Sequence, residues 1–432
     1  MLHLCFLLGV LGLEHYFEQV LDHFTPAARN VTFKQRYFVN DHAYVEGGPG
    51  FLYVGGESSI GEYLVKSGLA VDLAAEHNGV LYALEHRYYG KSQPFEILSV
   101  ANLKYLSASQ ALEDLACFAK TIRHRPSKWF LIGGSYPGNL AAWGRQKYPG
   151  VFQGALASSA PVEVKADFQE YDTMVGLAFG ETCHSIVNQL MRYLDDLYSL
   201  GKLDDVKAEV KCTRVHDDIL FLYTLADAIS SIVQTNDANY SPNINELCSA
   251  VSQPVNIPDK LSRLLEILSS FFRTRGTTCY GFTGISDLKA LSHNQDSFFR
   301  QWTYQSCQEF GYWQTASAYP VRSKHLTIDW FSNFYCKPPF FTPAIGPPNT
   351  YAINSEHRGK QIDTTNILFT NGQFDPWSAL SNTNRNAIVI ANASHVSDLG
   401  PADPSDSPSL VRARQIIKHT FRSWINPSDR FN

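Results

Sequence analysis

A serine that follows two glycines at the end of an apolar run is the feature that most constrains the fold of this chain. The segment Trp129-Phe-Leu-Ile-Gly-Gly-Ser135-Tyr-Pro-Gly-Asn-Leu-Ala-Ala-Trp143 predicts a buried strand over residues 129–132 that turns sharply into a helix. Such a turn holds a serine hydroxyl exposed above a sheet. The alternative is an ordinary glycine-rich turn between a strand and a helix.

The turn departs at one position from the pattern G-x-S-x-G of the nucleophile elbow in α/β-hydrolases. Gly133 and Ser135 fit, but Pro137 stands where the second glycine is expected, and Gly138 follows one place later. Proline is tolerated there because amides in the first helical turn have no intrahelical acceptor and its fixed φ suits a helix. We therefore expect an altered but working elbow with Ser135 as the nucleophile.

Strand-like and helix-like patterns alternate around this turn. Apolar runs and amphipathic segments follow one another in the order 51–54 (strand), 62–76 (helix), 79–84 (strand), 107–124 (helix), 129–132 (strand), a helix to 148, and 154–157 (strand). Strands at 366–370 and 387–391 and a helix at 408–425 close the chain. This order predicts a mostly parallel sheet with helices on both faces, as in the α/β-hydrolase fold.

The middle of the chain has a different character. Helical patterns replace strands at 185–200, 216–233, 259–272 and 297–305, and a proline-rich stretch follows. We expect a helical cap, residues 165–338, inserted into an α/β-hydrolase domain made of residues 14–164 and 339–432.

Several features predict the secretory pathway. Residues 1–13 are almost wholly apolar and too short to span a bilayer, so they predict a signal peptide; the alternative is a buried N-terminal strand. Glycosylation sequons occur at Asn30, Asn239 and Asn392. An even set of cysteines without a Cys-x-x-Cys pair predicts disulfides rather than a zinc site: Cys183, Cys212, Cys248, Cys279, Cys307 and Cys336.

Composition excludes some partners. Charged residues make up 18% of the 432 residues, the net charge is −5, and no basic run occurs, so we do not expect nucleic acid to bind. No segment after the first thirteen residues is long and apolar enough for a transmembrane helix. No metal or cofactor is expected.

Two late residues are candidates for the groups that activate a serine. A serine alcohol needs a base, and the base needs an orienting acid; α/β-hydrolases supply these in the order Ser, Asp, His. Asp375 follows the strand at 366–370 and His395 follows the strand at 387–391. Taken singly, Asp-Pro is a common turn pair and His395 is one of fourteen histidines. Asp398 is the alternative acid, but it lies only three residues from His395.

Further candidates concern the oxyanion and the substrate. The backbone N–H of Tyr136 and an amide of the glycine-rich Gly55-Gly56-Glu57 loop, that of Gly56, are the expected oxyanion donors. Glu57 is a candidate partner for a substrate amine, and the alternative is a structural glutamate. Trp377 is a second candidate substrate-binding residue.

Several motifs together resemble the prolylcarboxypeptidase and dipeptidyl peptidase II family of serine peptidases. They are the Ser135 elbow, Leu84-Glu-His-Arg-Tyr-Tyr-Gly, Asn371-Gly-x-x-Asp375-Pro-Trp and His395-x-x-Asp. Others are most similar to its thymus-specific serine protease branch: Phe17-Glu-Gln-x-Leu-Asp-His-Phe, Ala157-Ser-Ser-Ala-Pro-Val, Tyr304-Gln-x-Cys-x-Glu-Phe-Gly and Pro404-Ser-Asp-Ser-Pro-Ser-Leu. The resemblance runs from about Tyr16 to the C-terminus.

The resemblance implies a lysosomal or secreted serine exopeptidase that cleaves short peptides after proline, with Ser135 as nucleophile, His395 as base and Asp375 as orienting acid. It leaves open whether the enzyme is a carboxypeptidase, a dipeptidyl peptidase or an endopeptidase, and whether it forms a homodimer. It also implies the disulfides Cys183–Cys248, Cys212–Cys279 and Cys307–Cys336. The alternatives are a lipase or esterase on the same fold, and a non-catalytic hydrolase-like binding protein.

Overall fold

The computed structural model describes residues 14–26, 30–237, 240–276, 279, 298–338, 340–384 and 387–427. The predicted signal peptide and the sequon at Asn239 lie outside these residues. No helix in the described part of the chain is long and apolar enough to cross a membrane.

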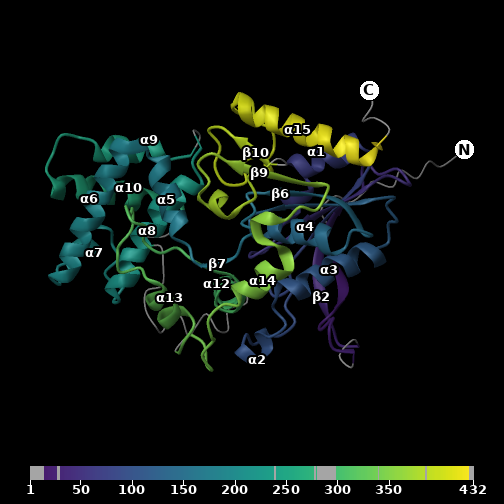
Figure 1. Ribbon diagram of the computed structural model, residues 1–432, viewed down its shortest axis with the longest axis horizontal. Helices are drawn as coiled ribbons and strands as arrows, with labels where there is room; N and C mark the ends of the chain where they lie inside the picture. The colour runs from purple at the N-terminus through teal and green to yellow at the C-terminus, as the bar shows by residue number, and fades with distance from the viewer. Residues whose placement is uncertain are drawn as a thin grey trace, which may run out of the picture.

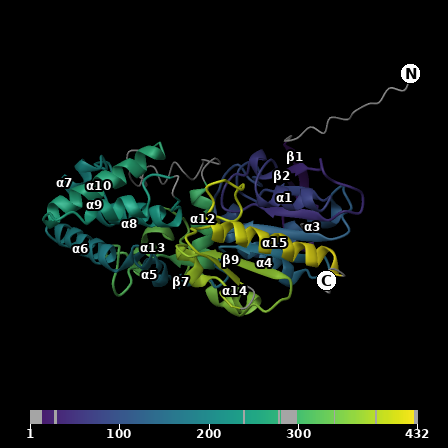
Figure 2. The ribbon, with the colours of Figure 1, turned by 90° about the horizontal axis from the view of Figure 1, so that it is seen from above.

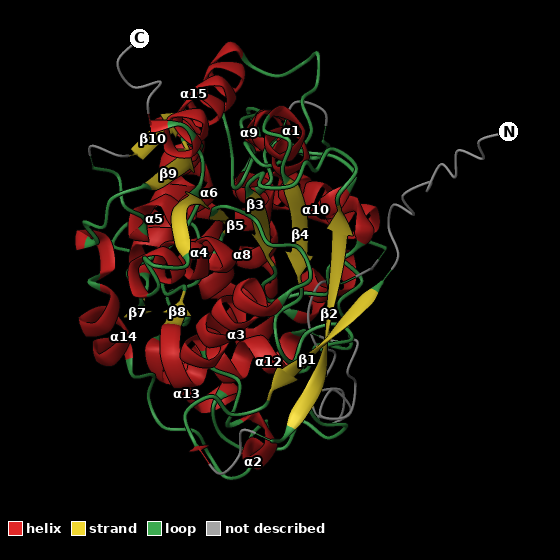
Figure 3. Ribbon diagram, turned by 90° about the vertical axis from the view of Figure 1, so that its right-hand side faces the viewer, coloured by secondary structure: helices red, strands yellow, loops and turns green. Residues whose placement is uncertain are grey.

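An eight-stranded sheet forms the centre of the larger part of the molecule (Figure 1, Figure 3). Its strand order is β1-β2-β4-β3-β5-β6-β9-β10, with antiparallel pairing from β1 to β4 and parallel pairing from β4 to β10. The strands are β1 (His15–Val20), β2 (Thr32–Asn40), β3 (Gly50–Val54), β4 (Val80–Leu84), β5 (Trp129–Gly134), β6 (Phe152–Ser158), β9 (Ile367–Gly372) and β10 (Ala387–Ile390). This mostly parallel sheet confirms the predicted α/β-hydrolase fold.

Helices cover both faces of the sheet because successive strand residues point to opposite sides. Leu52 packs in the core cluster that includes residues of α3 and α4, whereas its neighbour Phe51 packs in the cluster that includes residues of α1 and α15. Smaller helices lie in the connections. The helices of this part are α1 (Leu69–Glu76), α2 (Val100–Leu103), α3 (Ala108–Thr121), α4 (Tyr136–Lys147), α14 (Thr350–His357) and α15 (Pro408–Ile425).

The helix expected over residues 62–76 is interrupted. A 3-10 turn, η2 (Glu62–Val65), precedes α1, and Gly68 between them has φ +106°. A Cβ at Gly68 would lie 2.8 Å from the carbonyl oxygen of Leu399, and the N–H of Leu69 donates to that same oxygen at 3.1 Å. The chain is therefore bent where it docks on the loop after β10, a contact that periodicity along the sequence does not reveal.

Most of the helices in the segment predicted to form the cap, residues 165–338, lie at one end of the molecule, as two views agree (Figure 1, Figure 2). Its chain leaves the larger part through β7 (Lys165–Asp167) and pairs there with β8 (Gly311–Trp313) in a small parallel sheet. The remaining elements of the cap are α5 (Gln169–Ala178), α6 (Gly180–Ser199), α7 (Asp204–Glu209), α8 (Asp218–Gln234), α9 (Ile244–Val251), α10 (Ile257–Thr274), α12 (Phe299–Gln305), the π-helical turn η4 (Ser306–Phe310) and α13 (Ile328–Tyr335).

Three disulfides tie segments of the cap together. They join Cys183 to Cys248, Cys212 to Cys279 and Cys307 to Cys336, which are the pairs that the resemblance implies. The first one links α6 to α9. Bonds across spans of 65, 67 and 29 residues restrict the unfolded chain and so stabilise a segment that has little sheet of its own.

Candidate active site

Ser135 has the backbone conformation of a strained turn. It lies between the end of β5 and the first residue of α4, with φ 63° and ψ −135°. A non-glycine residue held there costs about 1–3 kcal/mol and persists only where surrounding contacts enforce it. Its N–H donates to the carbonyl of Ser158 at 2.8 Å, and its own carbonyl accepts from the N–H of Gly138 at 2.8 Å. The residue is partly exposed to solvent.

Although Pro137 replaces the usual second glycine of the elbow, Gly133 and Gly138 still let α4 pack closely against β5 and β6. A Cβ at Gly133 would lie 2.1 Å from the carbonyl oxygen of Pro137. A Cβ at Gly138 would lie 2.8 Å from Cβ of Ala160 and 3.0 Å from the carbonyl oxygen of Ser158. Gly138 thus allows α4 to pack on the end of β6, one place later than in the usual pattern. Pro137 occupies the first turn of α4.

Asp375 and His395 contact each other. Nδ1 of His395 lies 2.8 Å from Oδ1 of Asp375, and the carboxylate is fully buried while the imidazole is 8% exposed. Asp375 caps the 3-10 turn η6 (Pro376–Leu380) after β9, where Oδ1 also accepts the N–H of Trp377 at 3.0 Å. Because an ionised carboxylate only accepts, Nδ1 of His395 carries the proton, which leaves Nε2 free to act as a base.

The loop that carries His395 packs against the residue before Ser135. A Cβ at Gly134 would lie 2.8 Å from Cγ1 of Val396. The N–H of Val396 donates to Oγ of Ser159 at 2.9 Å. Val396 is β-branched and has φ 52°, a conformation that such residues rarely adopt. The carboxyl ends of β5, β6, β9 and β10 therefore bring the serine, the acid and the histidine to one edge of the sheet.

Asp398, the alternative acid, binds two hydroxyl groups instead. Oδ1 accepts from Ser158 at 2.5 Å and Oδ2 accepts from Thr370 at 2.8 Å. Burial raises the pKa of this carboxyl group. Since Ser158 ends β6 and pairs with Thr370 of β9, Asp398 attaches the loop after β10 to this edge of the sheet.

The two oxyanion candidates lie side by side. A Cβ at Gly56 would lie 2.3 Å from Cγ of Pro137, so the loop after β3 touches the first turn of α4. The N–H of Tyr136 is the first amide of α4 and has no intrahelical acceptor. Glu57 follows Gly56, is half-buried and interacts electrostatically with His395, while its burial raises its pKa.

A buried hydrogen-bonded chain holds the side chain of Tyr136. Its hydroxyl lies 2.9 Å from Nε2 of His86 and accepts from Nε2 of Gln305 at 3.0 Å. Burial lowers the pKa of His86 to about 4, and its Nδ1 lies 2.7 Å from the carbonyl of Arg87, so Nε2 is the acceptor for the Tyr136 hydroxyl. Tyr89 in turn donates to Oε1 of Gln305 at 2.6 Å.

Sequence reasoning missed this chain of contacts. Gln305 lies in α12, 169 positions from Tyr136, and no local pattern connects them. His86 belongs to the motif Leu84-Glu-His-Arg-Tyr-Tyr-Gly, whose sequence does not reveal this contact. Arg87 of the same motif pairs with buried Asp114 at 2.6 Å, the structural role that a buried arginine favours.

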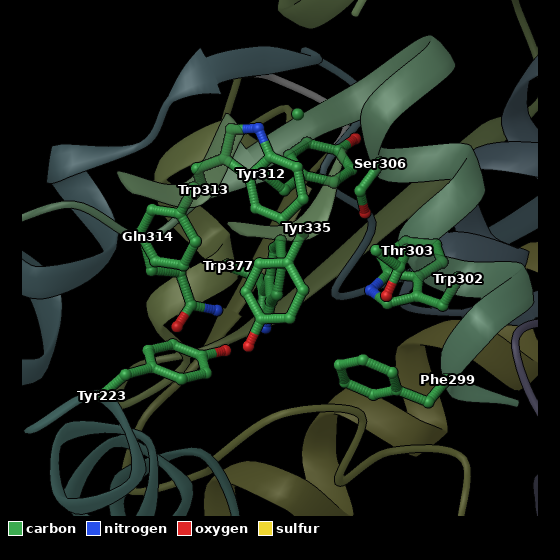
Figure 4. Close-up of a pocket in the computed structure, with 12 residues that line it drawn as sticks. Tyr223, Phe299, Trp302, Thr303, Ser306, Tyr312, Trp313, Gln314, Tyr335 and Trp377 are labelled. Atoms are coloured by element: carbon green, nitrogen blue, oxygen red, sulfur yellow. The ribbon is translucent and has the colours of Figure 1, made fainter. Parts of the chain in front are cut away.

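A cavity of about 90 Å³, partly open to solvent, is lined by cap residues and, from outside residues 165–338, by Trp377 of η6 (Figure 4). Figure 4 shows aromatic rings on several sides, with the Tyr223 and Tyr335 hydroxyls near one another. Trp377 links it to the serine edge, because its ring centroid lies 5.4 Å from that of Tyr312 and 6.4 Å from that of His395. Its lining residues are Tyr223, Phe299, Trp302, Thr303, Ser306, Gly311, Tyr312, Trp313, Gln314, Phe331, Tyr335 and Trp377.

The two glycosylation sequons in the described residues are not part of this group of side chains. Asn30 and Asn392 are exposed, as a glycosylated asparagine must be. Among the residues that the structure describes, no group of three His, Cys, Asp or Glu side chains is placed to hold a metal ion. The arrangement at the sheet edge thus offers a hydroxyl, a buried imidazole–carboxylate pair and candidate backbone donors, which together suit acyl transfer.

A family model and curated relatives show the family of this chain. The sequence matches the family described as serine carboxypeptidase S28 over residues 19–417. It is 31% identical to the thymus-specific serine protease of Mus musculus, covering 96% of this chain and 88% of that protein. It is 29% identical to the lysosomal Pro-X carboxypeptidase of Bos taurus, covering 95% and 87%. Among solved structures, it is similar to proline iminopeptidase from Mycobacterium smegmatis with a TM-score of 0.43 and 11% identity, covering 92% and 97%.

Proposed function

The chain belongs to the serine carboxypeptidase S28 family, and on that premise we propose that it is an exopeptidase that cleaves short peptides after proline with Ser135, His395 and Asp375. Its family makes it a serine hydrolase of the peptidase class. The observation that carries the catalytic assignment is the 2.8 Å contact between His395 and Asp375 at the sheet edge that holds Ser135.

The proposed reaction proceeds through an acyl-enzyme. Oγ of Ser135 attacks the scissile carbonyl carbon while Nε2 of His395 takes the hydroxyl proton. That proton passes to the leaving nitrogen as the C–N bond breaks, and a water molecule then releases the acyl group by the same steps. Asp375 stays ionised, keeps the proton on Nδ1 and stabilises the imidazolium that forms.

The amides of Tyr136 and Gly56 would stabilise the negative oxygen of the tetrahedral intermediate. Backbone donors suit this task because they are fixed before the reaction begins. The buried contacts of the Tyr136 hydroxyl with His86 and Gln305 support the assignment, since they hold the residue that carries one of the two donors.

The cavity would receive the side chain on the acyl side of the scissile bond. Aromatic surfaces without charged groups suit a proline ring, as they do in other proline-binding grooves. Trp377 would form the wall next to the triad, because it contacts both Tyr312 in the cavity and His395. The bovine relative is named a Pro-X carboxypeptidase, which supports a preference for proline.

Charge favours recognition of a free N-terminus. Glu57 lies beside the Gly56 donor and interacts with His395, and its carboxylate would attract an α-amine and repel a C-terminal carboxylate. We therefore expect short N-terminal fragments, such as dipeptides ending in proline, as the main products.

Disulfides and relatives support the secretory pathway as the location. The structure contains three disulfides, which form in oxidising compartments. One relative is named lysosomal and another, from Arthroderma benhamiae, is named extracellular. We also propose that the protein resides in the lysosome, that Asn30 and Asn392 are glycosylated, and that residues 1–13 are removed.

Digestion of a peptide library tests the proposed specificity. Purified protein is incubated with peptides that carry proline at each position, each made with a free and with an acetylated N-terminus, and the products are read by mass spectrometry. Proline-ending fragments from free N-termini support the proposal. Single residues released from C-termini would identify a carboxypeptidase and contradict the role of Glu57, whereas hydrolysis only of p-nitrophenyl esters would contradict a peptidase.

A further inference from the structure

One residue of the cap contacts three elements around the proposed catalytic pair. Gln234 is the last residue of α8, and its carbonyl oxygen accepts the backbone N–H of His395 at 3.1 Å. Its side-chain oxygen Oε1 accepts from Nε1 of Trp377 at 3.0 Å and from the hydroxyl of Tyr171 at 2.9 Å.

These contacts close a ring of hydrogen bonds. Oε1 of Gln234 binds the indole N–H of Trp377, and the backbone N–H of Trp377 binds Oδ1 of Asp375 at 3.0 Å. That same Oδ1 lies 2.8 Å from Nδ1 of His395, whose backbone N–H returns to Gln234. The relative position of the acid and the histidine is thus fixed through a residue that belongs to neither loop.

We propose that Gln234 is a positioning residue that makes the cap a part of the catalytic centre. The inference rests on the proposed roles of Ser135, His395 and Asp375, and it adds that these groups are aligned only while α8 is seated against them. The cap then has two tasks: it supplies most of the lining of the cavity, and it holds the base and the acid at the distance that proton transfer requires.

The place of Gln234 at a helix end strengthens the argument. The last four carbonyls of a helix have no intrahelical partner, and the C-terminal end carries partial negative charge. The carbonyl of Gln234 accepts a hydrogen bond from the backbone N–H of His395, so it has a partner outside the helix. The negative end of α8 therefore faces the residue whose imidazole becomes positively charged during the reaction.

The helix that carries Gln234 is itself firmly held. Eleven of its residues are buried, and Ser230 accepts from Nη2 of Arg322 at 2.9 Å. Arg322 is fully buried and pairs with Asp172 of α5 at 3.0 Å, so α8 and α5 are fixed to each other. Tyr171, the neighbour of Asp172, donates to Gln234, which extends this contact to the catalytic loops.

Side-chain variants test the proposal. Gln234→Met keeps length and volume but removes the acceptor, whereas Gln234→Glu keeps an oxygen that accepts both hydrogen bonds. Gln189→Met, on the exposed side of α6, is the matched control. The readouts are the rate constant for inactivation by a small fluorophosphonate, which does not depend on the peptide cavity, and kcat for a peptide substrate. Circular dichroism and the melting temperature report folding.

We expect Gln234→Met to lower both rates roughly 10- to 100-fold, as a displaced catalytic group does, while Gln234→Glu and Gln189→Met stay within a few-fold of the wild type. Trp377→Phe removes the donor of the same bond, so its effect on the inactivation rate should be less than additive with Gln234→Met. If Gln234→Met does not fold, Trp377→Phe alone must slow inactivation.

Two results overturn the inference while leaving the proposed function intact. One is a folded Gln234→Met variant that reacts at the wild-type rate while Ser135→Ala is inert. The other is an equal loss in Gln234→Met and Gln234→Glu, because the hydrogen bonds would then not be the cause. A wild-type protein that the fluorophosphonate does not label at Ser135 would instead overturn the proposed function, and this inference with it.

Discussion

The ring of Pro137 fills the space that a side chain at Gly56 would need. A Cβ built on Gly56 falls 2.3 Å from Cγ and 2.6 Å from Cδ of that ring. Pro137, which replaces the usual glycine of the elbow, therefore packs against a glycine, Gly56, in the loop after β3. This loop and the first turn of α4 each carry one of the two proposed oxyanion donors.

The contact predicts a strong effect of Gly56→Ala. The added methyl must separate the loop from α4 and so misalign a backbone donor, a loss that costs about 100- to 1,000-fold in kcat at other oxyanion holes. Steady-state kinetics on a proline peptide measure it.

The double variant Gly56→Ala/Pro137→Gly is the control, because removing the ring gives the methyl room. We expect it to recover most of the lost kcat. Wild-type turnover in Gly56→Ala alone would show that the loop after β3 does not supply a donor.

Glu57→Gln tests recognition of the substrate amine. Loss of an ion pair with a charged group costs about 1.5–3 kcal/mol, so KM for peptides with a free N-terminus should rise roughly tenfold or more. Acetylated peptides, which have no amine charge, should be cleaved as poorly by the variant as by the wild type. An equal change for both kinds of peptide would contradict the role of Glu57.

The same residue predicts a pH dependence. Burial raises the pKa of Glu57, so its carboxylate becomes neutral as the pH falls through that raised value. In the wild type, KM for free-amine peptides should therefore rise towards acidic pH, and in Glu57→Gln this component should disappear. A pH series of KM for both proteins decides the point.

Much of this fold was predictable from local patterns, but the contacts between distant segments were not. The helix at 408–425 begins and ends where its amphipathic pattern does, because Ser407 caps it and a proline starts its first turn. The Ser135 elbow follows from glycines that lie next to it. In contrast, the contact of Gln234 with His395 joins residues 161 positions apart, and helical periodicity marks Gln234 only as the end of a helix.

Two buried carboxyl groups should each contribute more stability in acid than at neutral pH. Burial raises the pKa of Glu309 to about 8 and that of Asp227 to about 6, so the folded protein holds protons that the unfolded chain releases near pH 4. This contribution to the free energy of unfolding is complete below the unfolded pKa values and is lost as the pH rises through the folded ones.

Between about pH 5 and pH 8 these two carboxyl groups lower the melting temperature as the pH rises, while His86 and His357, whose pKa burial lowers to about 4, act in the opposite direction. Glu309→Gln, which keeps an acceptor for the N–H of Ala108, should weaken that slope. Thermal unfolding at several pH values measures it, and equal slopes for the two proteins would contradict the account of Glu309.

The disulfide between Cys183 and Cys248 should contribute strongly to the stability of the cap. Closing a span of 65 residues restricts the unfolded chain by about 4 kcal/mol. The double variant Cys183→Ser/Cys248→Ser should therefore unfold at a much lower urea concentration. Reduction of the wild type with dithiothreitol should have at least as large an effect, and a reduced protein as stable as the oxidised one would contradict it.

Labelling of Ser135 tests the central claim most directly. The intact protein is treated with a fluorophosphonate, its mass is measured, and the modified residue is located by peptide mapping, with Ser135→Ala and Asp375→Asn beside the wild type. We predict one adduct, on Ser135, with no adduct in Ser135→Ala and labelling slowed by orders of magnitude in a folded Asp375→Asn. An adduct on another residue, or equal labelling of the wild type and Ser135→Ala, would contradict the account.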